Sequence, residues 1–215
     1  MSTYIAVLDY DHLENPIFLT SFARALAKHP ERRGIIIHGD SAYTERLLQN
    51  GTPRAEAQRR CMLELNHKLV GLLADQNVSA IGTHPFRKNM IVKKGDELLF
   101  NQAVFDQLPQ TPMLVLSGLI STDEGEAPVS LPQLVEFLHQ SINQSRILIF
   151  SRSEQSEMIK SAETAETIIL GSTYSEKVNS LVPIEFKKFP IPFELINSME
   201  FGNWPDHKSI LNFVC

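Results

Sequence analysis

Residues 34–39 read Gly-Ile-Ile-Ile-His-Gly, the pattern of a buried strand that ends abruptly at a glycine. A helical pattern begins at Ser41, directly after this turn. α/β folds build ligand loops in this way at the carboxyl ends of their strands. Free N–H groups at a helix start attract anions, and Gly39 has no side chain to keep a phosphate or carboxylate away. The turn indicates either an anion-binding loop or an ordinary connection, and ordinary connections are more common.

Strand and helix patterns alternate along most of the chain. Strands are predicted at residues 4–8, 35–37, 78–82, 113–116, 147–150 and 168–170, and helices at 16–26, 41–50, 54–76, 134–143 and 154–165. Residues 90–92 and 98–100 flank Lys-Lys-Gly-Asp and predict a β-hairpin, whereas the proline-rich tail after residue 170 is less regular. The alternation predicts an α/β/α sandwich with a mainly parallel central sheet of about eight strands and helices on both faces.

Composition narrows the range of partners. The 215 residues include 20 Lys and Arg against 25 Asp and Glu, a net charge of −5 without a basic run, so nucleic acid is not an expected partner. The apolar runs are only strand-length and the first residues lack a basic segment, so neither a membrane span nor a signal peptide is expected. Cys61 and Cys215 lack metal-type spacing, and reduced thiols in a cytoplasmic protein are expected.

The order of these segments resembles the amino acid kinase family, and within it the acetylglutamate kinases. Residues 35–39 resemble the family's strand and His-Gly-Gly-Gly loop, and residues 64–70 resemble its long-helix motif. Residues 79–82 and 88–91 resemble the strand and hairpin that follow, and residues 112–116 resemble a further strand.

The resemblance implies a single domain of the amino acid kinase, or carbamate kinase-like, type over residues 1–215, and a doubly wound fold of another family is the alternative. Residues 1–125 would form the half that binds an acyl amino acid, and residues 126–215 a shortened nucleotide half. The hairpin within residues 78–100 would lie over the carboxyl ends of the sheet. An active member would use Mg-ATP to phosphorylate a carboxyl group, such as that of an N-acyl amino acid.

Two loops depart from the family pattern at positions that carry charge. The family's first strand leads into Lys-x-Gly-Gly, whose lysine neutralises the transferring phosphate, but here Leu8 or Asp9 stands in that place. The second loop has Asp40 and Ser41 where the family has further glycines. An aspartate at this turn would repel a phosphate.

The second half departs as well. The family's Asn-x-Asp motif corresponds here to Ser130 and Pro132, so a charged residue is lost. Only a short stretch follows the strand at 147–150, and Lys160 is the one candidate for the family's second, nucleotide-binding lysine. Phosphoryl transfer depends almost wholly on positioning and on positive charge, so these losses predict little kinase activity.

Three functions remain open from the sequence. The first is a catalytically degenerate relative of acetylglutamate kinase that binds a small carboxylate or a protein partner. The second is an active kinase in which Arg87, Lys88 or Lys160 replaces the missing lysine. The third is a purely structural or regulatory subunit.

Candidate ligand-binding residues follow from the strand ends and the hairpin. Residues 38–41, which are His38, Gly39, Asp40 and Ser41, form the turn after the second strand. His38 could orient a carboxylate, or it could be satisfied by a neighbouring carbonyl. Arg87 and Lys88 belong to the densest basic group, and Arg87 could clamp a carboxylate with two hydrogen bonds. A solvated loop is the alternative for this group.

No metal site is predicted. Asp9, Asp11 and His12 could hold a divalent ion, but a solvated acidic loop is the favoured interpretation. Cys61 falls in the long helix and is expected to be buried in the core rather than nucleophilic.

A homodimer is the expected assembly, because kinases of this family commonly self-associate through helices on one face of the sheet. The candidate surface is the helix at 54–76. Its apolar stripe, which could instead pack entirely on the sheet, contains Met62, Leu65, Leu69, Leu72 and Leu73.

Overall fold

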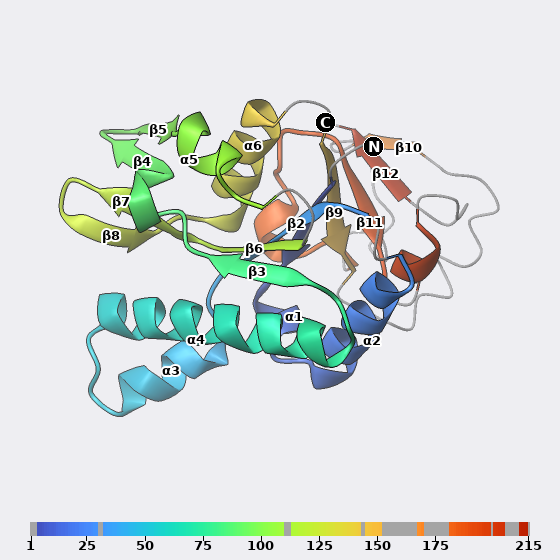
Figure 1. Cartoon of the computed structure of the whole chain (residues 1–215), viewed down its shortest axis with the longest axis horizontal. Helices are drawn as coiled ribbons and strands as arrows, with labels where there is room; N and C mark the ends of the chain where they lie inside the picture. The colour runs from blue at the N-terminus through green and yellow to red at the C-terminus, as the bar shows by residue number, and fades with distance from the viewer. Residues whose placement is uncertain are drawn as a thin grey trace.

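The computed structural model describes residues 4–29, 32–109, 113–142, 145–151, 167–169, 181–198, 200–204 and 211–214, and Figure 1 shows their arrangement. The predicted helix at 154–165 and the candidate Lys160 lie outside these residues. Within them, a large sheet crosses the molecule, helices cover both of its faces, and a smaller sheet stands at one end (Figure 1).

The main sheet has eight strands in the order β10-β12-β11-β9-β1-β2-β6-β3. Their bounds are β1 Tyr4–Leu8, β2 Gly34–His38, β3 Ala80–Thr83, β6 Met113–Ser117, β9 Arg146–Phe150, β10 Thr167–Ile169, β11 Phe193–Ile196 and β12 Leu211–Val214. All neighbours pair in parallel except β11 and β12, which are antiparallel. The prediction of a mainly parallel sheet of about eight strands is confirmed.

Strands β1 and β2 are buried along their whole length, as expected for parallel strands covered on both faces. Successive residues of β1 point to opposite layers of the core. Ala6 and Leu8 pack in the layer that contains Phe18 and Leu65, whereas Ile5 and Val7 pack in the other layer. The two core layers therefore hold the sheet between helices of different parts of the chain.

The helices α2 Pro16–Ala27, α3 Ala42–Gln49 and α4 Arg54–Asp75 lie on one face, and α6 Leu131–Ser141 covers the other (Figure 1). Short helices α1 Tyr10–Leu13, α5 Gln102–Asp106, η2 Ile184–Phe186 and η3 Glu200–Asn203 join them. Ser41 caps α3 and Ser130 caps α6, each accepting a backbone N–H of the first turn. None of the described helices is both long and apolar enough to cross a membrane.

A smaller outer sheet has the order β5-β4-β7-β8. Its strands are β4 Ile91–Lys94, β5 Glu97–Phe100, β7 Leu119–Thr122 and β8 Gly125–Pro128. The predicted hairpin is confirmed as β4–β5, with Gly95 at positive φ in the turn. A second hairpin, β7–β8, turns at Gly125 and was not predicted. Because β7 follows β6 across Gly118, the outer sheet grows directly from the carboxyl end of the main sheet.

The apolar stripe of the long helix α4 packs against the main core. Cys61, Leu65, Leu69 and Leu73 are buried in this core and Leu72 packs against it, which confirms the core position predicted for Cys61. Met62 is buried as well. The homodimer stays a prediction, and a dimer would need a surface other than this stripe. The tail is more regular than predicted, since it supplies β11 and β12 to the main sheet.

Candidate functional site

The parallel strands bring several chain segments to one edge of the main sheet, here called the carboxyl edge. The residues that directly follow these strands are Asp9, Gly39, His84, Gly118, Ser151 and Asn197. Ligands in open α/β sheets bind at this edge. The outer sheet and the start of α4 stand beside it (Figure 1).

A cavity of about 290 Å³, here called the turn pocket, opens at the turn after β2. Its lining combines residues from the strand ends, α4, the start of α6 and η2: Tyr10, Gly39, Asp40, Gln58, Met62, Pro128, Val129, Ser130, Leu131 and Glu185. The predicted residues Gly39 and Asp40 thus both line a cavity. Glu185, from the far end of the chain, completes the wall.

His38 is fully buried behind this turn and is not among the lining residues. Its Nδ1 lies 3.0 Å from the Gly39 carbonyl oxygen, and its Nε2 lies 3.2 Å from Asn66 Nδ2. A neutral ring that donates from Nδ1 and accepts at Nε2 satisfies both contacts. Burial lowers the pKa of His38 from 6.5 to about 4, against the opposing effect of the Gly39 hydrogen bond.

Asn66 ties α4 to three strands and was not singled out from the sequence. Its Nδ2 also donates to the carbonyl of Val115 at 3.1 Å. A Cβ added to Gly82 would come within 2.1 Å of Asn66 Oδ1, so β3 needs glycine here for close approach. The amide fixes His38, and through it the backbone of the Gly39 turn.

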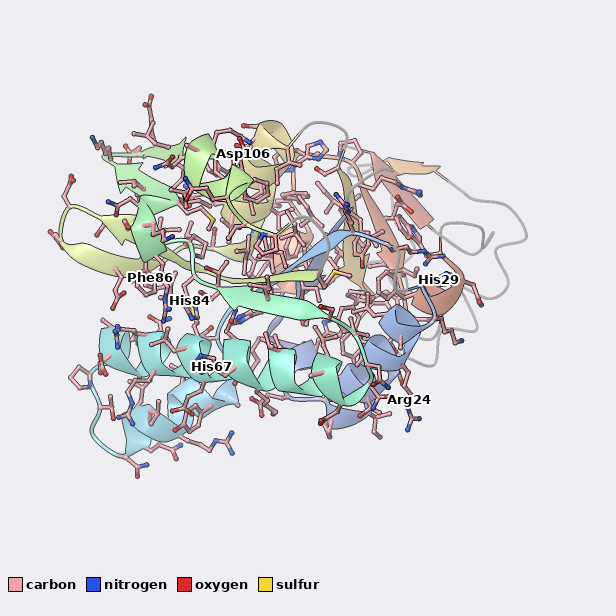
Figure 2. All side chains as sticks on the ribbon, in the orientation of Figure 1. Arg24, His29, His67, His84, Phe86 and Asp106 are labelled. Atoms are coloured by element: carbon pink, nitrogen blue, oxygen red, sulfur yellow. The ribbon has the colours of Figure 1, made fainter. Side chains whose placement is uncertain are left out.

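His84 forms a second buried contact at the carboxyl edge. Its Nδ1 lies 2.8 Å from Ser117 Oγ, and its ring stacks on Phe86 at 5.7 Å. Burial, together with the positive charges of Arg87 and His67, lowers the pKa of His84 to about 4. Figure 2 shows His84 and Phe86 between α4, which carries His67, and the outer sheet. His84 and Ser117 are both buried, and this pair joins the end of β3 to the end of β6.

Acid should destabilise the protein through these histidines. A histidine whose folded pKa is lowered contributes its full stability above the unfolded value of 6.5, and loses it as the pH falls toward 4. His38 alone should lower the free energy of unfolding by about 2 kcal/mol between pH 7 and pH 5. Urea unfolding at several pH values measures this slope, and His38→Gln should make it shallower. An equal slope in His38→Gln would show that His38 does not cause it.

The turn pocket has an acidic character. Partial burial, together with the negative charges of Asp9 and Asp40, raises the pKa of Glu185, although this side chain keeps an exposed surface. Burial and the nearby acids Glu45, Glu14, Asp40 and Asp11 raise the pKa of Tyr10. Within the described part of the chain, the lining contains two carboxylates and neither lysine nor arginine. Its described residues therefore offer no cationic side chain to a phosphate.

The other candidate residues lie away from the turn pocket. Arg87 and Lys88 are exposed in η1 Arg87–Asn89, between β3 and β4, and neither lines the pocket. Ser41 is buried, accepts the Tyr43 N–H as the cap of α3, and lies 3.6 Å from Cys61 Sγ. Their roles in ligand binding stay predictions.

The loop after β1 is not the solvated loop that the sequence favoured. Asp9 and His12 are both buried, because Asp9 caps α1 and His12 packs on Phe18. His12 Nδ1 lies 2.5 Å from Asp9 Oδ1, and its Nε2 lies 3.0 Å from the Ser151 carbonyl oxygen. Across the residues that the structure describes, no three His, Cys, Asp or Glu side chains gather as a metal site.

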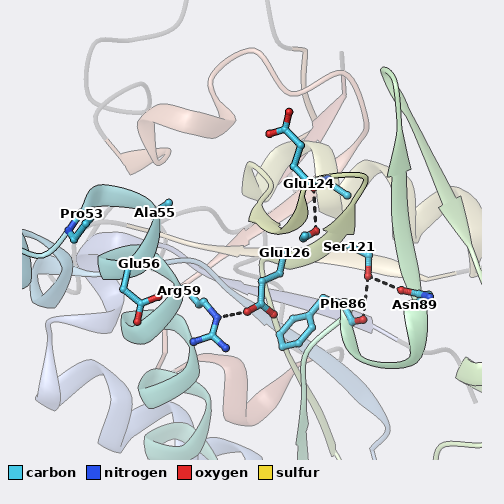
Figure 3. Close-up of a pocket in the computed structure, with 11 residues that line it drawn as sticks. Pro53, Ala55, Glu56, Arg59, Phe86, Asn89, Ser121, Glu124 and Glu126 are labelled. Atoms are coloured by element: carbon cyan, nitrogen blue, oxygen red, sulfur yellow. Dashed lines mark hydrogen bonds and ion pairs between the residues drawn. The ribbon is translucent and has the colours of Figure 1, made fainter.

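A larger, open cleft of about 740 Å³ lies between the start of α4 and the outer sheet (Figure 3). Arg59 on α4 pairs with Glu126 on β8 across it. Ser121 Oγ donates to the Phe86 carbonyl at 3.0 Å and also contacts Asn89. Arg59 is thus neutralised by Glu126, so this cleft offers no unpaired described cation to an anion.

The sequence matches no protein-family model. No curated protein matches it either. Solved structures do match. An isopentenyl phosphate kinase covers 94% of this chain and 93% of its own, with a TM-score of 0.62 at 14% identity. The isopentenyl phosphate kinase of T. acidophilum, in a product complex, covers 99% and 100% with a TM-score of 0.62 at 10% identity.

The aspartokinase III of E. coli, in complex with aspartate and ADP, covers all of this chain and 65% of its own, with a TM-score of 0.57 at 12% identity. At these identities the likeness speaks for the fold alone. The chain has the amino acid kinase fold.

Proposed function

We propose that this chain is a catalytically degenerate protein of the amino acid kinase fold that binds a small ligand in the turn pocket and does not transfer phosphoryl groups. One observation carries the proposal: Asp40 and Glu185 line the cavity at the turn where an active kinase would need positive charge. Removing a single oxyanion donor from an enzyme costs about 100- to 1000-fold in rate. The two carboxylates would also repel the phosphate, which should lower the rate further.

The resemblance to acetylglutamate kinases suggested a small carboxylate as ligand. The acidic lining speaks against a simple carboxylate in the turn pocket, because Asp40 and Glu185 would repel it. A protein partner remains open. The division into a substrate half and a nucleotide half, the cytoplasmic location and the homodimer also remain predictions.

The test is ATP turnover at high protein concentration, with acetylglutamate and related acids as acceptors. We expect no release of ADP above the buffer rate, and no Mg-ATP binding by calorimetry in the micromolar to millimolar range where enzymes bind their substrates. Acetate kinase, assayed in the same buffers, shows that the method detects turnover.

Clear turnover would overturn the proposal and favour the active kinase. Single replacements by alanine at Arg87, Lys88 and Lys160 would then identify the cation that serves the phosphate. Loss of turnover in Lys160→Ala alone would assign that role to the family's second lysine. Thermal unfolding of each variant would separate lost chemistry from lost fold.

A further inference from the structure

We propose that the turn pocket binds a small organic ammonium ion, a ligand of opposite charge to the phosphate or carboxylate expected at such a turn. This inference rests on the proposed function, since it names the ligand class of the same cavity. The observations that carry it are the two carboxylates in the lining, the apolar wall beside them, and the small volume of the pocket.

The carboxylates are not neutralised by the side chains around them. Asp40 accepts a hydrogen bond from Gln58 Nε2 at 3.3 Å, and this amide donor carries no charge. Within the described part of the chain, neither Asp40 nor Glu185 forms an ion pair. A cation between them would satisfy both, and an ammonium group offers several N–H donors to do so.

Apolar side chains form part of the remaining wall, beside the polar Gln58 and Ser130. Met62 and Leu131 are buried, and Val129 lies beside them. The Tyr10 ring, 39% exposed, stands at the same pocket and can contact a cation through its face. A volume of about 290 Å³ is at the lower end of ligand pockets, so the ligand is small.

A bare metal ion fits less well than an amine. Mg²⁺ usually binds through one or two carboxylates and several retained waters, so it would leave the apolar part of this wall without a partner. Here two carboxylates come from different elements, the turn after β2 and η2, and apolar side chains occupy part of the remaining wall. An amphipathic cation uses both kinds of surface.

The experiment compares three linear four-carbon compounds that differ mainly in charge: diaminobutane, butanediol and succinate. Calorimetry and amide chemical shifts at low salt measure their binding to the full chain. We expect diaminobutane to bind at millimolar concentration or better, and the other two compounds not to bind. Because the ligand favours ionised carboxylates, the affinity should also rise with pH through the range in which Glu185 ionises.

Two variants and one control locate the site. Asp40→Asn and Glu185→Gln should each weaken diaminobutane binding by about tenfold, the effect of losing one charged hydrogen bond. Asp75→Asn makes the same change of net charge at the last residue of α4 and should leave the affinity unchanged. Far-ultraviolet circular dichroism and thermal unfolding check that each variant folds.

Equal binding of succinate and diaminobutane, stronger binding of succinate, or no binding of any compound would overturn the ammonium assignment. If Asp75→Asn weakened diaminobutane binding as much as the two pocket variants do, the binding would be non-specific charge attraction, and the ammonium assignment would be overturned too. These results differ from the failure of the proposed function, which is ATP turnover. A chain that turns over ATP yet prefers diaminobutane would refute the degenerate function and keep the ligand class.

Discussion

Replacing Gly34 with alanine should lower the free energy of unfolding by about 3 kcal/mol, the upper part of the range for overpacked cores. Gly34 pairs with Tyr4 across β1 and β2. A Cβ at residue 34 would lie only 2.2 Å from Tyr4 Cζ, with two further ring carbons of Tyr4 within 2.7 Å. A single methyl group therefore forces the tyrosine ring to move.

Tyr4 has little room to move. Its side chain is 1% exposed, and its ring meets Phe201 and Trp204 edge-on at 5.7 and 5.3 Å. Its hydroxyl donates to Met113 Sδ at 3.5 Å, and burial raises the pKa of the phenol. The clash would therefore spread into the neighbouring rings rather than relax at the surface.

Thermal and urea unfolding of Gly34→Ala measure the loss, and a 3 kcal/mol change should lower Tm by roughly 6–12 °C in a chain of this size. Gly71→Ala is the matched control, because a Cβ there meets no atom within 4 Å. Alanine in that helix should raise stability by about 0.5–1 kcal/mol. The double variant Tyr4→Leu/Gly34→Ala should show less than the sum of its single losses. Wild-type stability in Gly34→Ala would refute the close packing.

The core strands could be predicted because they are nearly continuous apolar runs. β1 was predicted at its observed bounds, and β9 differs from its prediction by one residue. The hairpin β7–β8 was not predicted because its turn reads Thr-Asp-Glu-Gly and apolar and polar residues alternate only weakly in its strands. β11 was not predicted because Pro190 and Pro192 precede it and only four residues form the strand. Its place in the sheet depends on pairing with β9, a long-range contact that local pattern does not contain.

Some residues of the candidate site could likewise be predicted from the sequence, and others could not. The Gly39 turn and Asp40 could be predicted, because a strand end followed by a capped helix marks the carboxyl edge. Glu185 could not, because η2 reaches the turn pocket only through the fold of the whole chain. Asn66 belongs to the segment 64–70 that resembles the family's long-helix motif, but its partners lie on three strands and could not be predicted. The negative charge of Asp40 could thus be predicted, and only the second carboxylate of the pocket needed the structure.

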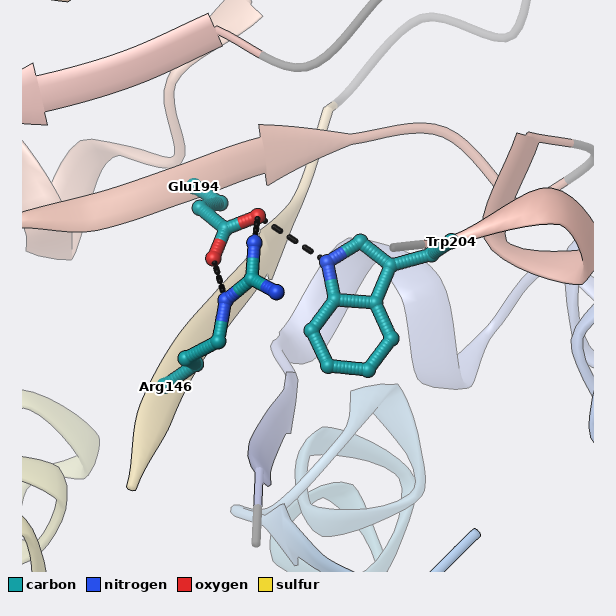
Figure 4. Close-up of polar contacts among 3 residues, drawn as sticks. All are labelled: Arg146, Glu194 and Trp204. Carbon is teal, nitrogen blue, oxygen red and sulfur yellow. Dashed lines mark hydrogen bonds and ion pairs between the residues drawn. The ribbon is translucent and has the colours of Figure 1, made fainter. Parts of the chain in front are cut away.

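The second large effect concerns Glu194 on β11, which joins Arg146 at the start of β9 and Trp204 (Figure 4). Its Oε1 lies 2.5 Å from Arg146 Nε, and its Oε2 accepts from Arg146 Nη2 at 2.7 Å and from Trp204 Nε1 at 2.9 Å. The guanidinium also lies 4.5 Å from the Trp204 ring centre. The carboxylate therefore holds two strands and the segment after η3 together.

Glu194→Ala should lower the free energy of unfolding by about 3–4 kcal/mol. Breaking a fully buried ion pair costs about 3–5 kcal/mol, because the remaining partner is left without compensation. Glu194 is 7% exposed, but the Arg146 side chain is 38% exposed and can partly turn to water, which moves the expectation down within that range. The buried indole N–H of Trp204 would also lose its acceptor, a further loss of about 1–3 kcal/mol that overlaps with the first.

Three comparisons isolate the cause. Glu194→Gln keeps an acceptor for Trp204 and should lose less than the alanine variant. Glu45→Ala breaks the exposed pair with Arg54, whose side chains are 56% and 65% exposed, and should cost at most about 1 kcal/mol. A double-mutant cycle of Glu194→Ala with Arg146→Met gives the coupling between the two charges. A loss in Glu194→Ala no larger than that in Glu45→Ala would mean that packing alone, without this carboxylate, keeps β11 and Trp204 in place.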